Sequence, residues 1–127
     1  MDTGAWYAAS VPSDPDHAAA SAFVRSNRER LVTGDYVYDE LLTLFRARGN
    51  TDRAQDWVNQ ARQGRCEIVR ITDADILDAT EVFFNFADKE WSFTDCTSRV
   101  MMQRFGIQRA FTFDDHFQQF GTVAVVP

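Results

Sequence analysis

The chain has 127 residues, the length of one domain, and 45% of them are hydrophobic, enough to bury a core. Its net charge of −6 argues against a protein that holds nucleic acid by bulk electrostatic attraction, and no apolar run is long enough to span a membrane. Cys66 and Cys96 each lie in an apolar segment, so we interpret them as reduced core residues of a cytoplasmic protein, not as a disulfide or a zinc pair.

Helical and strand patterns alternate through the first half of the chain. Two prolines bracket a turn over residues 12–15, and apolar residues at helical spacing follow it. The patterns predict, in order, a helix capped by Asp16, a strand over Arg30–Thr33, a helix over Asp35–Arg48, a helix capped by Thr51 that ends near Gly64, and a strand over Cys66–Ile71.

The same alternation continues in the second half. A helix capped by Asp73 is expected to carry four residues on its buried side, namely Ile76, Thr80, Phe83 and Phe84. A helix from Ser92 to Gly106 and strands over residues 110–113 and 122–126 complete the chain. Strands that alternate with helices predict one α/β domain over residues 1–127, in which a central parallel sheet is covered by helices on both faces.

Carboxylates near the carboxyl ends of such strands are candidates for a site, because ligands bind at that edge of a parallel sheet. Asp114 and Asp115 directly follow a strand. Asp95 begins a helix, where Ser92-x-x-Asp95 is close to a capping box, so a purely capping role for Asp95 remains open. Glu40 lies on the margin of its helix's apolar stripe, and a solvated head group on a packed stem is the alternative to a site role.

Four segments together resemble the motifs of the PIN-domain family, most closely its VapC-type toxins. They occur in order from end to end of the chain: residues 2–6 (Asp-Thr-Gly-Ala-Trp), 40–43 (Glu-Leu-Leu-Thr), 92–95 (Ser-Phe-Thr-Asp) and 112–117 (Thr-Phe-Asp-Asp-His-Phe). The resemblance implies a three-layer α/β/α fold and a metal-dependent ribonuclease. Its catalytic and metal-binding residues would be Asp2, Glu40, Asp95 and Asp114, supported by Thr3 and Thr94, and the ion would be Mg²⁺ or Mn²⁺.

The chemistry of four clustered carboxylates is consistent with that implication, because a divalent cation relieves their mutual repulsion and also attracts a phosphodiester. The resemblance further implies an RNA substrate and a cognate VapB-like antitoxin, with a homodimer as an open possibility. The alternative function is a catalytically weak or inactive PIN-like module that serves as a protein-binding domain.

Two expectations concern single positions. The family has a central strand before its first Asp, and only Met1 precedes Asp2 here, so we expect the native product to begin upstream with that strand. The histidines, His17 and His116, are isolated in the sequence and are interpreted as surface or helix-end residues.

Overall fold

Short parallel strands and six α-helices make up the part of the chain that the computed structural model describes, residues 1–121 and 123–127. The elements are α1 (Thr3–Ser10), α2 (His17–Ser26), β1 (Val32–Gly34), α3 (Asp35–Ala47), α4 (Thr51–Arg62), β2 (Glu67–Val69), α5 (Asp73–Asn85), α6 (Phe93–Phe105), β3 (Arg109–Phe111), the 3₁₀ helix η1 (Asp115–Phe120) and β4 (Ala124–Val126). Thr122, the first residue of the last predicted strand, lies outside the described residues.

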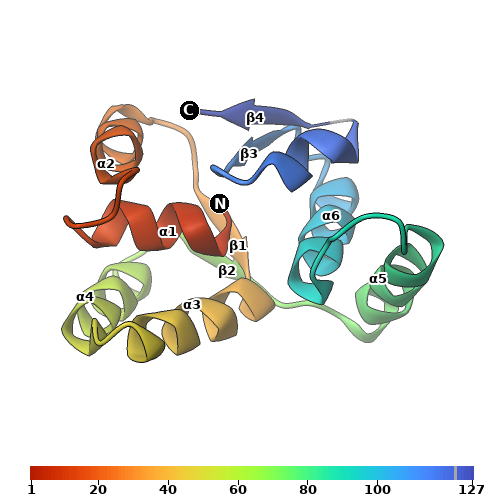
Figure 1. Cartoon of the computed structure of the whole chain (residues 1–127), viewed down its shortest axis with the longest axis horizontal. Helices are drawn as coiled ribbons and strands as arrows, with labels where there is room; N and C mark the ends of the chain where they lie inside the picture. Colours follow the sequence, from red (N-terminus) through yellow and green to blue (C-terminus); the bar gives the residue numbers. More distant parts are fainter. Residues whose placement is uncertain (122) are drawn as a thin grey trace.

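The described strands form two parallel pairs, which confirms the predicted α/β class. β1 pairs with β2 and β3 pairs with β4, each over three residues (Figure 1). Met1 and Asp2 connect the two pairs, since the Met1 amine donates to the Val32 carbonyl at 2.8 Å and the Asp2 N–H donates to the Phe111 carbonyl at 3.2 Å. The start of the chain thereby brings Asp2 to the ends of β1 and β3, and the expected strand upstream of Asp2 stays a prediction.

The helices lie on either side of these strands (Figure 1), and the core between the elements is divided into clusters of buried apolar residues. α1, α3 and α4 enclose one core cluster, in which Leu41 and Phe45 are fully buried and Trp6 meets Trp57 edge to face. A second cluster joins α5, α6 and the strands around Trp91 and Met101. Burial of this apolar area is the main stabilising contribution, and it fixes the helices that carry or adjoin the site residues.

Several predicted helix limits are confirmed, while two capping residues were assigned wrongly. α3 begins at Asp35 and is followed by Gly49 at φ 71°, a left-handed conformation that favours glycine. α5 is capped by Thr72 rather than Asp73, because the Thr72 side chain accepts from the N–H of Asp75 in a complete capping box. α4 has Asn50 rather than Thr51 at its N-cap. Asp16 is the N-cap of α2, as predicted, although its side chain makes no capping hydrogen bond.

The predicted buried side of α5 is also wrong in part. Phe83 and Phe84 are 43% and 69% exposed, whereas Asp75 and Ala79 are buried against α6. A charged side chain can occupy that buried face because Asp75 pairs with Arg104 at 3.1 Å and accepts from the Thr72 N–H. The apolar periodicity of the sequence predicted Phe83 and Phe84 on the buried side, because a buried carboxylate with a charged partner does not contribute to an apolar pattern.

Cys66 and Cys96 are free and buried, as predicted. Among the described residues, no helix is long and apolar enough to cross a membrane.

Candidate active site

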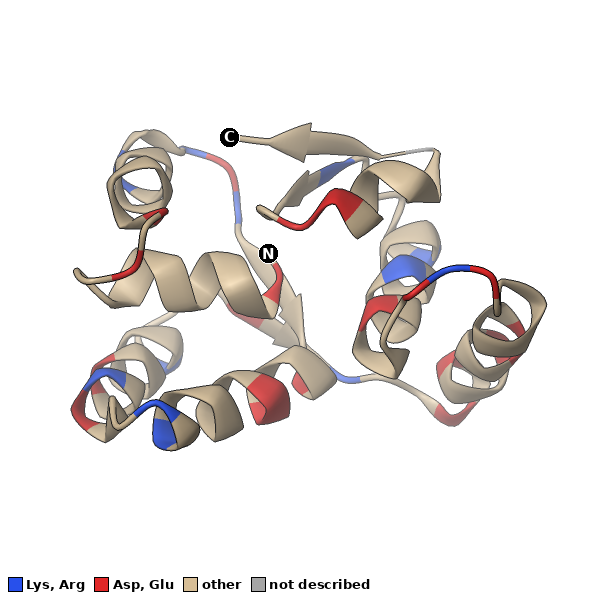
Figure 2. Cartoon of the chain, in the orientation of Figure 1, with Lys and Arg blue, Asp and Glu red and all other residues tan. Residues whose placement is uncertain are grey.

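All four predicted site residues line one cavity of about 470 Å³. Each comes from a different element: Asp2 is the N-cap of α1, Glu40 lies in α3, Asp95 in the first turn of α6, and Asp114 is the N-cap of η1. Figure 2 shows acidic segments at these places around the middle of the molecule. The fold therefore brings together carboxylates that are up to 112 residues apart in the chain (114 − 2).

The Asp2 carboxylate is held at both of its oxygens. Its Oδ1 accepts from the Ala5 N–H at 2.7 Å, and its Oδ2 accepts from the Thr112 hydroxyl. Burial raises the pKa of the Asp2 carboxyl from an ordinary 3.8 to about 6, although these two hydrogen bonds act in the opposite direction. A carboxylate that is buried and fixed in this way is costly in isolation and suited to a cation.

Asp95 serves as a capping residue and as a wall of the cavity at the same time. Its Oδ2 accepts from the Ser92 N–H at 2.8 Å, and its own N–H donates to the Ser92 hydroxyl at 3.1 Å, which completes the capping box predicted from the sequence. Burial raises the pKa of Asp95, and the nearby Asp114 contributes in the same direction. The capping role and the site role are thus compatible, because the carboxylate has a second oxygen.

Glu40 is tied to the start of α1. The Thr3 hydroxyl donates a hydrogen bond to its Oε2, so the carboxylate is directed toward the cavity instead of outward from α3. Thr94, the other residue expected to support the site, also lines the cavity. Asp39, which directly precedes Glu40 in the chain, is exposed.

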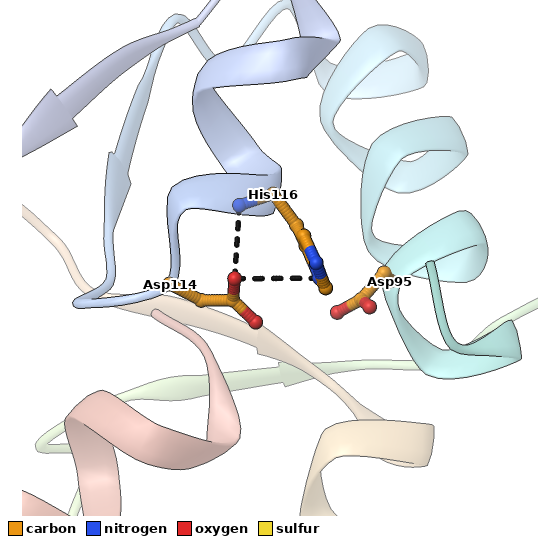
Figure 3. A group of neighbouring side chains, drawn as sticks. All are labelled: Asp95, Asp114 and His116. Atoms are coloured by element: carbon orange, nitrogen blue, oxygen red, sulfur yellow. Dashed lines mark hydrogen bonds and ion pairs between the residues drawn. The ribbon is translucent and has the colours of Figure 1, made fainter. Parts of the chain in front are cut away.

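His116 joins the site although it was predicted to be a surface or helix-end residue. One ligand atom each from Asp95, Asp114 and His116 lie within 4.8 Å of one another (Figure 3). The His116 ring Nδ1 is 3.3 Å from Oδ1 of Asp114, and its backbone N–H donates to the same oxygen at 2.8 Å. In the sequence, the only indication that His116 belongs to the site is its position two residues after Asp114. That spacing indicates a site role only because η1 turns the imidazole toward Asp95 of α6.

The second histidine lies elsewhere, with its Nδ1 2.7 Å from the Ala8 carbonyl of α1. Asp115 is exposed beside the site and is not among the residues that line the cavity.

The donor set suits a divalent cation. Carboxylate oxygens are the ligands that Mg²⁺ and Mn²⁺ prefer, and imidazole is a further ligand for transition metals. Asp95, Asp114 and His116 form the closest group in the described part of the chain, and Asp2 and Glu40 line the same cavity around it. The raised pKa values of Asp2 and Asp95 fit this arrangement, since a cation would offset the cost of burying negative charge.

A family model and two named relatives match most or all of this chain. A family model described as "PIN domain" matches residues 1–123. The chain is 32% identical over 130 residues to the "23S rRNA-specific endonuclease VapC20" of Mycobacterium tuberculosis, an alignment that covers 100% of this chain and 97% of that protein. It is 27% identical over 114 residues to the "Ribonuclease VapC26" of the same organism, covering 90% of this chain and 84% of that protein.

A solved structure gives the same result at the level of the fold. The crystal structure of M. tuberculosis VapC20, described as a "Sarcin-Ricin loop cleaving toxin", superposes with a TM-score of 0.92 at 28% sequence identity, and the match covers 99% of this chain and 97% of that chain. With a family model that spans nearly the whole sequence and a relative aligned along its full length, the chain belongs to the PIN-domain family, within which it is similar to the VapC toxins.

Proposed function

We propose that the chain is a metal-dependent endoribonuclease of the VapC toxin type, which cleaves RNA phosphodiester bonds and is neutralised by a cognate VapB-like antitoxin. The observation that carries the proposal is the meeting of Asp2, Glu40, Asp95 and Asp114 on the wall of one cavity of about 470 Å³. The printed names of the relatives, ribonuclease and 23S rRNA-specific endonuclease, support RNA as the substrate and make ribosomal RNA the first to test.

The site residues would together bind a divalent cation, Mg²⁺ or Mn²⁺. Asp95, Asp114 and His116 are close enough to hold the ion together, and Asp2 and Glu40 line the same cavity. When bound, the ion supplies Lewis acidity that activates a water and offsets negative charge on the scissile phosphate. The protein's own contribution is to keep the carboxylates fixed through Thr112, Ala5, Ser92 and Thr3, so that little reorganisation accompanies the reaction.

A bound ion would also explain how a nuclease with a negative net charge can bind a negatively charged substrate. With a net charge of −6, the chain has no general attraction for RNA, and phosphate recognition would depend on the ion. Cleavage should therefore stop when the ion is removed.

The test is cleavage of purified ribosomes and of deproteinised 23S rRNA by the purified chain. Activity is expected with Mn²⁺ or Mg²⁺, none with EDTA, and recovery when the ion is restored. Asp95→Asn, prepared in parallel, excludes a contaminating nuclease. Cleavage that persists in EDTA, or that Asp95→Asn retains in full, would count against the proposed function.

A further inference from the structure

Thr112 links two of the site carboxylates through a single oxygen. It directly follows β3 and is 1% exposed. Its hydroxyl donates to Oδ2 of Asp2, and the same oxygen accepts from the N–H of Asp114 at 2.9 Å. Both hydrogen bonds of the Thr112 hydroxyl, one donated and one accepted, are therefore made with site residues.

The hydroxyl is itself held in place by the sheet. The Thr112 N–H donates to the Val126 carbonyl at 3.1 Å, next to the β3–β4 pair. The preceding carbonyl, that of Phe111, accepts from the N–H of Asp2. The backbone of Thr112 is therefore fixed by the sheet, and its hydroxyl in turn fixes the positions of Asp2 and Asp114.

The two bonds fix different parts of the site. Asp2 is held at Oδ2 by Thr112 and at Oδ1 by the Ala5 N–H, which leaves the carboxylate little rotational freedom. On the other side, Thr112 fixes the backbone of Asp114, the residue that also caps η1 and orients His116. A small shift of Thr112 would change the distance between Asp2 and Asp114.

We propose that Thr112 is a positioning residue for the metal site: its hydroxyl sets the separation of the Asp2 carboxylate from Asp114 and thereby sets the affinity for the divalent ion. The inference rests on the proposed metal-dependent function. A residue that orients ligands from outside the coordination sphere typically changes metal affinity by about 10- to 100-fold when it is removed. The alternative is a buried threonine whose hydroxyl is merely satisfied, in which case its loss would change stability and leave metal binding intact.

The experiment compares Thr112→Val, which keeps the shape and removes the hydroxyl, with Thr112→Ser, which keeps the hydroxyl. Thr80→Val is the matched control, because Thr80 is half-buried in α5 and donates its hydroxyl to the Ile76 carbonyl at 2.7 Å, away from the cavity. Binding of Mn²⁺ to each purified full-length chain is measured by titration calorimetry, with circular dichroism as the check of folding. Thr112→Ala takes the place of Thr112→Val if that variant does not fold.

The expected result is a Mn²⁺ dissociation constant raised by about 10-fold or more in Thr112→Val, and within about threefold of wild type in Thr112→Ser and Thr80→Val. A folded Thr112→Val chain that binds Mn²⁺ as wild type does overturns the inference and leaves the proposed function standing. A Thr112→Ser chain that loses as much affinity as Thr112→Val also overturns it. If the wild-type chain binds neither Mn²⁺ nor Mg²⁺, the proposed function fails first, and the role of Thr112 fails with it.

Discussion

The Thr3 hydroxyl donates a hydrogen bond to Oε2 of Glu40, which joins the first residue of α1 to the middle of α3 across 37 positions of sequence. Glu40 is half-buried beside the apolar stripe of α3, where an unpartnered carboxylate would be costly. Thr3 donates to one of the two oxygens, and Glu40 lines the cavity. The contact explains why a carboxylate can stand at the margin of a buried helix face.

Glu40→Gln tests the charge at that position. Glutamine keeps the length of the side chain and can still accept from Thr3, so folding should be unchanged while the negative charge is lost. We expect a fall in kcat of roughly a hundredfold or more, the typical cost of removing one group that stabilises the transition state electrostatically. Initial rates on RNA in saturating Mn²⁺ measure it, and Asp39→Asn, one residue away and exposed, should cleave at the wild-type rate. Equal rates for Glu40→Gln and wild type would remove Glu40 from the site.

The two roles of Asp95 can be separated by a pair of variants. Asp95→Asn keeps an oxygen that can accept from the Ser92 N–H, so the capping box should persist while activity falls by about a hundredfold or more. Ser92→Ala removes the oxygen that accepts from the Asp95 N–H, and should lower the free energy of unfolding by about 1 kcal/mol. Denaturant unfolding and cleavage rates on both proteins measure the two effects. If Asp95→Asn loses stability and keeps its rate, Asp95 is a cap alone.

Much of the fold could be predicted from local signals. Ser92 caps the start of α6 and Gly106, at φ 63°, ends it, because capping and left-handed conformations depend on single residues that the sequence displays. The meeting of the four carboxylates in one cavity could also be predicted, since strand ends and helix starts point to one edge of a parallel sheet and the motifs resemble a family. Such features depend on residues that are close together in the sequence, so they can be recognised without knowledge of the tertiary structure.

The rest depends on partners that are distant in sequence. Asp75 is buried because Arg104 reaches it from the next helix, and no pattern within α5 shows that contact. His116 and Thr112 enter the site through η1 and the β3–β4 pair, whose hydrogen bonds decide where each side chain points. The pairing of β1 with β2 and of β3 with β4, with Met1 and Asp2 connecting the two pairs, likewise follows from packing rather than from any single segment.

The imidazole of His116 should influence which ion the site prefers. Nitrogen ligands favour transition metals over Mg²⁺, which binds oxygen almost exclusively in proteins. His116→Gln offers an oxygen in place of the ring nitrogen, so we expect the ratio of Mn²⁺ to Mg²⁺ affinity to fall by several-fold. Calorimetric titration with each ion measures the ratio, and His17→Gln, which changes a histidine away from the cavity, is the control. An unchanged ratio would mean that His116 orients Asp114 without binding the ion.

The last prediction concerns the acid–base behaviour of Asp2, whose pKa burial raises to about 6 from an ordinary 3.8. Between these two values the folded chain retains a proton at Asp2 that the unfolded chain has released. The contribution of Asp2 to the stability of the metal-free protein must therefore decrease as pH rises from about 4 to about 6 and remain constant above that range. The pKa of Asp95 is raised as well and acts with the same sign.

Other groups titrate in the same range, so the measurement is the difference in melting temperature between wild type and Asp2→Asn, both in EDTA. That difference should be most favourable to wild type near pH 4 and should decline through pH 6, because Asn does not titrate. In the presence of Mn²⁺ the trend for wild type should reverse, since the ion binds the deprotonated carboxylate and its affinity rises as the proton leaves. A difference that is flat from pH 4 to pH 7 in EDTA would show that the Asp2 carboxylate titrates alike in the folded and unfolded chain, and it would remove the argument that its buried charge needs a cation.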